Sequence, residues 1–152
     1  MPNRLDYVEG EPAMLAYGAA LAERLARAFE QSTNAPQRSL VTLEGDLGAG
    51  KTTLARGILR GLGFEGHVKS PTYPIVELYE FARSRVYHLD FYRIRDAREL
   101  DFIGLDELLD ERAIMLVEWP QRAQGRLPRA DVEIRIRRQD AGRIVECDER
   151  SQ

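Results

Sequence analysis

The sequence predicts an α/β fold, a three-layer sandwich in which a mixed sheet has a parallel core and antiparallel hairpins. Three observations carry this prediction. A short apolar run at 40–43 leads through a glycine-rich segment straight into a helical pattern. The run 113–117 is apolar throughout, which suits a strand buried on both faces, as in a parallel sheet. Alternating apolar and charged residues near the C-terminus indicate a hairpin.

The other elements follow from the spacing of apolar residues and from the turn residues between them. Apolar side chains recur near helical spacing within residues 13–30, from Leu15 to Phe29, which predicts a helix there. The remaining expectations are a polar loop at 31–37, a helix over 51–62, a hairpin of strands 75–81 and 85–89, one or two short helices within 96–111 that break near Gly104, and a C-terminal hairpin of strands 131–137 and 143–147 with its turn at 140–142.

Composition and charge exclude several classes of protein. Hydrophobic residues make up 43% and charged residues 31% of the 152 residues, so the chain can bury a core, and we expect one domain over 1–152. No apolar run is long enough to span a membrane and the N-terminus lacks a signal-peptide pattern, so we expect a cytoplasmic protein with no membrane partner. One cysteine excludes an intrachain disulfide, and a net charge of −3 argues against DNA as a partner.

Residues 45–52 carry the strongest motif, because they match G-x-x-x-x-G-K-[ST] without a gap. Such a P-loop curls its backbone N–H groups around phosphate oxygens at the start of a helix. Lys51 would reach the β- and γ-phosphates, and the Thr52 hydroxyl would ligate Mg²⁺. A glycine-rich turn that only caps a helix has no need of this lysine, one of two lysines among 22 basic residues. The motif predicts a P-loop NTPase-like fold, in which the Asp46 side chain points outward and the phosphates are held by Gly45, Asp46, Leu47, Gly48, Ala49, Gly50, Lys51, Thr52 and Thr53.

A P-loop enzyme needs a second carboxylate near the metal, at the C-terminal end of a neighbouring strand. Glu118 directly follows the apolar run of the predicted buried strand, and Asp90 likewise ends the second strand of the first hairpin. One of the two is expected to hold the metal, while the other orients the attacking water. Residues 70–73 lie where many P-loop enzymes carry a γ-phosphate-sensing switch, in which Thr72 would respond to the phosphate; a proline turn explains this spacing equally well.

Four segments, in this order and spacing, resemble the TsaE (YjeE) family of bacterial P-loop ATPases: DLGAGKTT at 46–53, VKSPTY at 68–73, HLDFYR at 88–93 and VEWP at 117–120. The resemblance implies that the chain hydrolyses ATP in support of forming N6-threonylcarbamoyladenosine at position 37 of tRNAs that read codons beginning with A. It also implies two partner proteins, TsaB and TsaD, which carry out the transfer, stimulate a weak ATPase and mediate its contact with tRNA.

The resemblance also implies a role for each motif. Carried over by position, the roles are Mg²⁺ ligation by Thr52 and Glu118, phosphate binding by Lys51, catalysis by Asp90 and the switch at Thr72. ATP would be the nucleotide, with adenine contacts from the N-terminal segment and from Gly142 and Arg143. Residues 9–14 read Glu-Gly-Glu-Pro-Ala-Met and depart from the Ser/Thr-rich helix start that such families tend to have.

Three other functions are compatible with a P-loop in general. The main alternative is a small-molecule or nucleotide kinase, but such kinases close an arginine-rich lid, and here Arg93, Arg95 and Arg98 stand among acidic residues. A GTPase reads guanine through an Asn-Lys-x-Asp segment, which this sequence lacks. A protein that binds ATP without hydrolysing it stays open, because water activation depends on geometry.

Overall fold

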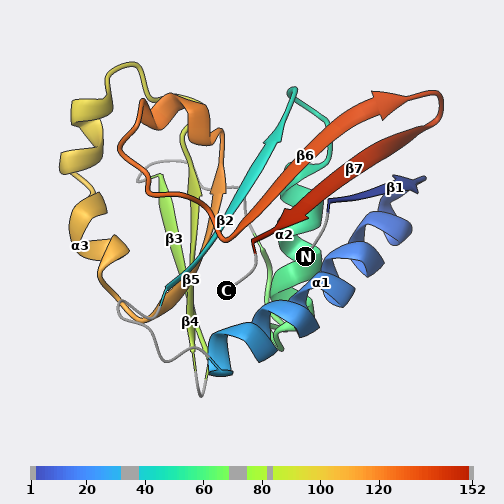
Figure 1. Cartoon of the computed structure of the whole chain (residues 1–152), viewed down its shortest axis with the longest axis horizontal. Helices are drawn as coiled ribbons and strands as arrows, with labels where there is room; N and C mark the ends of the chain where they lie inside the picture. The colour runs from blue at the N-terminus through green and yellow to red at the C-terminus, as the bar shows by residue number, and fades with distance from the viewer. Residues whose placement is uncertain (1–2, 32–37, 69–74, 82–83, 151–152) are drawn as a thin grey trace.

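The computed structural model describes residues 3–31, 38–68, 75–81 and 84–150, whose strands form one seven-stranded sheet in the order β1-β7-β6-β2-β5-β4-β3 (Figure 1). The described elements are β1 (Arg4–Val8), α1 (Glu11–Gln31), β2 (Arg38–Gly45), α2 (Lys51–Gly61), β3 (Val76–Glu80), β4 (Arg85–Asp90), the 3₁₀ helix η1 (Ala97–Asp101), α3 (Leu105–Leu109), β5 (Ala113–Glu118), the 3₁₀ helix η2 (Pro120–Ala123), β6 (Val132–Gln139) and β7 (Gly142–Glu149).

The centre of the sheet is parallel and its sides are antiparallel. Strands β6, β2, β5 and β4 run in one direction. Strand β7 pairs antiparallel with β6, β1 with β7, and β3 with β4. Glu118 on β5 pairs with Leu43 on β2 and with Asp90 on β4, so these three strands end side by side. The mixed sheet with a parallel core and hairpins is therefore as predicted.

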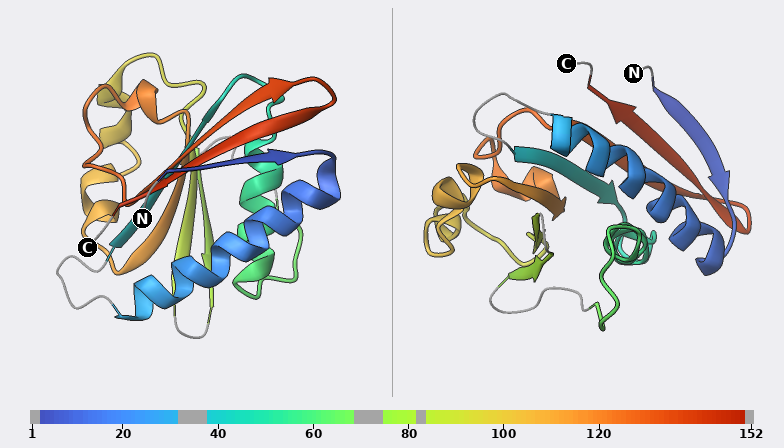
Figure 2. Two further views of the ribbon diagram at one scale, coloured as in Figure 1. Left: turned by 45° about the vertical axis from the view of Figure 1, so that its right-hand side comes forward. Right: turned by 90° about the horizontal axis from the view of Figure 1, so that it is seen from below.

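Helices cover both faces of the sheet, which completes the predicted three layers. Alternate residues of β5 enter two separate cores: Ile114 and Leu116 pack with residues of α1 and α2, whereas Ala113, Met115 and Val117 pack with residues of η1, α3 and η2. Figures 1 and 2 show α1 and α2 lying together, with α3 on the far side of the strands. Among the described residues, no helix combines the length and the apolar character needed to cross a membrane.

The predicted helices and strands are found with boundaries shifted by a few residues. The break expected near Gly104 lies between η1 and α3, where this glycine has a φ of 70°. No prediction covers β1, a five-residue edge strand with four exposed residues, whose formation depends on pairing with β7. Residues 32–37 of the predicted loop and the segment 70–73 lie outside the described residues.

Helices α1 and α2 approach closely where each carries a glycine. A Cβ atom at Gly18 of α1 would lie 2.7 Å from the carbonyl oxygen of Leu54 and 2.8 Å from the backbone nitrogen of Ile58, both on α2. A Cβ atom at Gly57 of α2 would likewise meet the backbone of Leu15. Backbone atoms cannot rotate away as side chains do, so these glycines set how close α2, and with it the P-loop, lies to α1.

We predict that Gly18→Ala lowers the free energy of unfolding by about 1–3 kcal/mol, the usual range for overpacking, although alanine is the better helix former. Urea denaturation measures this change. Glu23→Ala, at an exposed position of the same helix, is the control and is expected to change stability by no more than about 0.5 kcal/mol. A Gly18→Ala variant as stable as the wild type would contradict the close helix contact.

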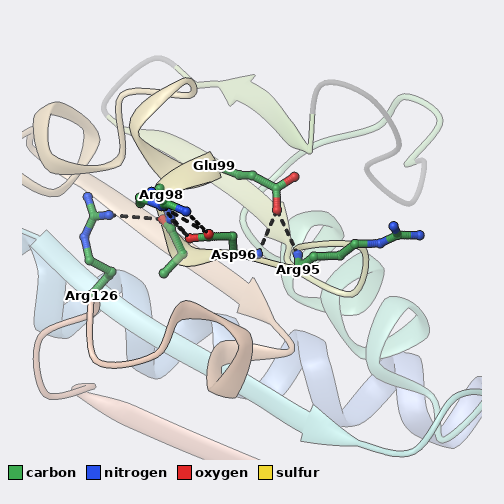
Figure 3. Close-up of polar contacts among 6 residues, drawn as sticks. Arg95, Asp96, Arg98, Glu99 and Arg126 are labelled. Carbon is green, nitrogen blue, oxygen red and sulfur yellow. Dashed lines mark hydrogen bonds and ion pairs between the residues drawn. The ribbon is translucent and has the colours of Figure 1, made fainter.

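The connection from β4 to β5 begins with a capped 3₁₀ helix (Figure 3). The Asp96 carboxylate accepts the backbone N–H of Arg98 at 2.9 Å, and its guanidinium at 2.7 Å. The Glu99 carboxylate accepts the backbone N–H groups of Arg95 and Asp96 at 2.8 and 2.9 Å. This reciprocal capping box fixes the start of η1 and hence the path of the chain between the two strands.

Arg98 holds the pKa of the Asp96 carboxyl at about 2, through hydrogen bonds from its guanidinium and its backbone N–H. Because the folded-state pKa is depressed, this carboxylate stabilises the fold fully above its unfolded-state pKa and loses that effect as pH falls toward 2. We predict that Arg98→Ala raises the pKa of Asp96 in an NMR titration of its carboxyl carbon. Arg95→Ala is the control and leaves it unchanged; equal values in wild type and Arg98→Ala would refute the assignment.

Candidate functional site

The P-loop leaves β2 and turns sharply into α2. Gly48 and Gly50 have φ values of 79° and 115°, in the left-handed region that favours glycine. The N–H of Ala49 donates to the carbonyl of Asp46 at 2.9 Å, and the Asp46 side chain is exposed, as predicted. No side chain among the described residues caps α2, so the N–H groups of its first turn stay available to an anion.

Lys51 is a nearly buried cation at the first position of α2, 5% exposed. Its ammonium donates to the carbonyl oxygens of Gly45 and Asp46, the second at 3.1 Å, and lies 4.5 Å from the ring centre of Trp119. Burial lowers the pKa of Lys51, and nearby carboxylates, Glu118 foremost, oppose that shift. The loop and an aromatic face therefore hold this ammonium next to the N–H groups that would meet a phosphate.

Glu118 ends β5 on the face that carries α2, and it is 2% exposed. Its two carboxylate oxygens lie 3.4 and 3.3 Å from the Thr52 hydroxyl oxygen, and the second lies 2.7 Å from Nε2 of His88. The structure thus brings together the two residues predicted to ligate Mg²⁺. A hydroxyl and a carboxylate fit this ion, which takes oxygen ligands and usually keeps several waters.

Asp90 ends β4 directly beside Glu118. One of its oxygens accepts the backbone N–H of Tyr92 at 3.0 Å, which fixes the carboxylate at the strand end. Burial is the main cause that raises the pKa of Asp90, and the neighbouring Glu118 charge adds to it. A carboxylate with a raised pKa is better able to take up a proton, as a water-activating base must.

One cavity of about 280 Å³ joins these groups. It contains both carboxylates and the residues that follow the P-loop turn. The lining residues are Leu47, Gly48, Gly50, Lys51, Thr52, Thr53, Asp90, Tyr92, Glu118 and Trp119.

A second cavity of about 220 Å³ lies on the other side of the P-loop, against α1 and the β6–β7 turn. The predicted Arg143 lines it and donates to the carbonyl of Ala49 at 2.9 Å. Gly142 packs under Tyr7, whose ring would lie 2.6 Å from a Cβ atom there, and its neighbour Ala141 lines the cavity instead. The N-terminal segment contributes Val8, Gly10, Glu11 and Met14.

Two larger cavities, of about 380 and 400 Å³, lie elsewhere and are lined by none of the predicted site residues. Size alone favours them, but neither is lined by the P-loop, by Asp90 or by Glu118. We therefore assign the functional site to the two smaller cavities, because P-loop residues line both of them. Thr72, predicted as a switch residue, lies outside the described residues.

The structure adds three residues to this neighbourhood. His88 contacts Glu118, a predicted metal ligand; it stands two residues before Asp90, and strand alternation places both on one face. The Arg122 guanidinium lies 5.5 Å from the ring centres of both Tyr92 and Trp119. Arg138 donates to a P-loop carbonyl at 3.4 Å. No local pattern in the sequence points to the two arginines.

The chain matches one family model over most of its length. The family model described as "Threonylcarbamoyl adenosine biosynthesis protein TsaE" matches residues 13–145. The chain belongs to the TsaE family. The matched range contains the P-loop, both carboxylates and the start of β7, so the site lies within the part shared with the family.

Individual relatives agree with the family. A protein from Haemophilus influenzae is 42% identical over 146 residues, which cover 96% of this chain and 89% of that protein. One from Bacillus subtilis is 42% identical over 99 residues, or 65% of this chain and 61% of that protein. Both are named tRNA threonylcarbamoyladenosine biosynthesis protein TsaE. The crystal structure of Bacillus subtilis YdiB matches 97% of this chain with a TM-score of 0.74 at 28% identity, and 85% of that chain is covered.

We predict that Lys51→Ala weakens the binding of ADP and ATP by about 1.5–3 kcal/mol, the range for a lost charge-assisted hydrogen bond. Isothermal titration calorimetry measures the change. Arg60→Ala removes the same charge from an exposed position of the same helix and is expected to bind both nucleotides normally. Equal affinities in Lys51→Ala and Arg60→Ala would contradict the P-loop assignment.

Proposed function

We propose that the chain is an Mg²⁺-dependent ATPase that supports the formation of threonylcarbamoyladenosine in tRNA. One observation carries the proposal: the P-loop and two carboxylates from separate strands, Asp90 and Glu118, line a single cavity. The description of the family and the names of its members supply the biological process.

The nucleotide is ATP, and the terminal phosphate goes to water. A GTPase needs a lysine in its guanine-reading segment, and the two lysines of this chain, Lys51 and Lys69, stand in no such segment. A kinase needs free arginines to close over the acceptor. Here Arg98 and Arg126 bond to carboxylates, and Arg122 donates to the backbone carbonyl of Tyr92 at 2.8 Å.

Phosphate binding follows from the P-loop geometry. The uncapped N–H groups of α2 and the loop donate to the β- and γ-phosphate oxygens, and the Lys51 ammonium exchanges its carbonyl partners for these oxygens. Thr52 and Glu118 would hold Mg²⁺. The bound ion would neutralise negative charge on the β- and γ-phosphate oxygens. Val8, Met14 and Arg143 line the second cavity, where an adenine ring would sit.

Hydrolysis then requires a water in line with the γ-phosphorus. Asp90 orients this water and accepts its proton, as the oxygen forms a bond to phosphorus and the bond from phosphorus to the β–γ bridging oxygen breaks. The products are ADP and phosphate. The proton leaves Asp90 afterwards for phosphate or solvent. The raised pKa of Asp90 favours the first transfer.

TsaB and TsaD are the proposed partners, and tRNA is met indirectly through them in the cytoplasm. A net charge of −3 gives the chain little attraction for nucleic acid by counterion release. The exposed side chains of Leu47 in the P-loop and Tyr92 beside Asp90 offer apolar surface next to the nucleotide site, where a protein partner would sense its state.

Phosphate release from ATP tests the proposal, measured for the chain alone, with TsaB and TsaD, and with both plus tRNA. We expect slow turnover alone, faster turnover with the two proteins, and loss of turnover when Mg²⁺ is chelated. A turnover rate that changes neither on chelation of Mg²⁺ nor on addition of the two proteins would refute the proposed function.

We predict that isosteric replacements separate the two carboxylates. Asp90→Asn lowers kcat by about 10²- to 10⁴-fold, the usual contribution of a general base, with ATP affinity unchanged. Glu118→Gln instead raises the Mg²⁺ concentration needed for half-maximal turnover. Glu23→Gln, at an exposed position of α1, is the control. Identical effects of the two replacements on kcat and on Mg²⁺ dependence would show that the roles are not divided in this way.

A further inference from the structure

His88 is a fully buried polar residue in the centre of β4, and within the described part of the chain its ring bonds to one side chain, Glu118. Its side chain is 0% exposed, and its Nε2 lies 2.7 Å from a carboxylate oxygen of Glu118. Its other ring nitrogen, Nδ1, is buried and has no hydrogen-bond partner among the described residues. Val86 and Leu116, its neighbours along β4 and across on β5, are both apolar and buried.

An apolar side chain would fill this core position without leaving a polar atom unpaired. A buried polar group without a hydrogen-bond partner is destabilising, so the structure carries a penalty at Nδ1. The hydrogen bond at Nε2 must therefore provide a benefit that outweighs the penalty at Nδ1. An ionised carboxylate only accepts, so His88 donates from Nε2 to Glu118.

This hydrogen bond decides where the Glu118 carboxylate points. The oxygen that accepts from His88 lies 3.3 Å from the Thr52 hydroxyl, and the other carboxylate oxygen lies 3.4 Å from the same atom. With one oxygen anchored by His88, the carboxylate is held with both oxygens beside the Thr52 hydroxyl, on the wall of the cavity that these two residues line. A ligand carboxylate held by a hydrogen-bonding partner binds its metal more tightly than a free one.

We propose that His88 is a positioning residue, which fixes the Glu118 carboxylate toward Thr52 so that the Mg²⁺ site is formed before the nucleotide binds. The inference rests on the proposed Mg²⁺-dependent function. It assigns His88 an effect on cation affinity and no contact with nucleotide.

A matched pair of variants tests this proposal. In His88→Gln the amide nitrogen reaches the position of Nε2 and can donate to Glu118, whereas in His88→Asn the shorter amide stays near the position of Nδ1. We expect His88→Asn to weaken Mg²⁺ binding to the ADP complex by about 10- to 100-fold, and His88→Gln to keep most of the affinity. Titration calorimetry with Mg²⁺ measures both. ADP affinity without Mg²⁺ is expected to be equal in all three proteins.

Several outcomes would overturn the proposal. Mg²⁺ affinity in His88→Asn equal to wild type, or equal losses in the two variants, would mean that His88 only fills space. A wild-type ADP complex that binds no Mg²⁺ would overturn the proposed function as well, whereas the variant results alone touch only the role of His88.

The wild-type protein provides a test that survives a folding failure of either variant. The chain has two histidines, and His67 is exposed, so long-range proton–nitrogen NMR spectra distinguish them. We expect His88 to carry a hydrogen on Nε2, both before and after addition of ADP and Mg²⁺. A hydrogen on Nδ1 alone would remove the donor to Glu118 and refute the proposal.

Discussion

The parallel pairing of β4 with β5 is the constraint on which the rest of the site depends. It sets Asp90 beside Glu118, while the pairing of β5 with β2 sets Glu118 beside Leu43, just before the P-loop. A slip of one residue would turn Glu118 toward α3 and away from Thr52, because side chains alternate between faces. Apolar residues of β5 enter the cores on both faces and hold this register, so packing of the core also positions the carboxylates.

The same arrangement brings together polar and strained groups that lower the stability of the fold. Cationic side chains of the chain itself, Lys51, Arg138 and Arg143, bond to carbonyl oxygens of the P-loop, which leaves its N–H groups to face a ligand. Trp119 has a φ of 56°, in a region that a large side chain rarely adopts, at a cost of about 1–3 kcal/mol. Glu118 is almost fully buried. We interpret these features as stability given up for a site formed in advance of its ligands.

The sequence predicts those parts of the site that depend on local patterns. The P-loop is a contiguous motif in the sequence. Asp90 and Glu118 each end an apolar run, and this pattern alone predicts that both lie at the same edge of the sheet. The edge strand β1 escaped prediction because it depends on pairing with β7, far along the chain. The role of His88 likewise depends on a contact between strands 30 positions apart.

A crystal structure with a non-hydrolysable ATP analogue, and with Mn²⁺ in place of Mg²⁺, tests the shared site most directly. Anomalous scattering locates the ion independently of the protein. We expect the ion bound by the Thr52 hydroxyl and Glu118, the phosphates against the first turn of α2, and the adenine beside Met14 and Arg143. An ion remote from Glu118, or a nucleotide in one of the two larger cavities, would contradict the site described above.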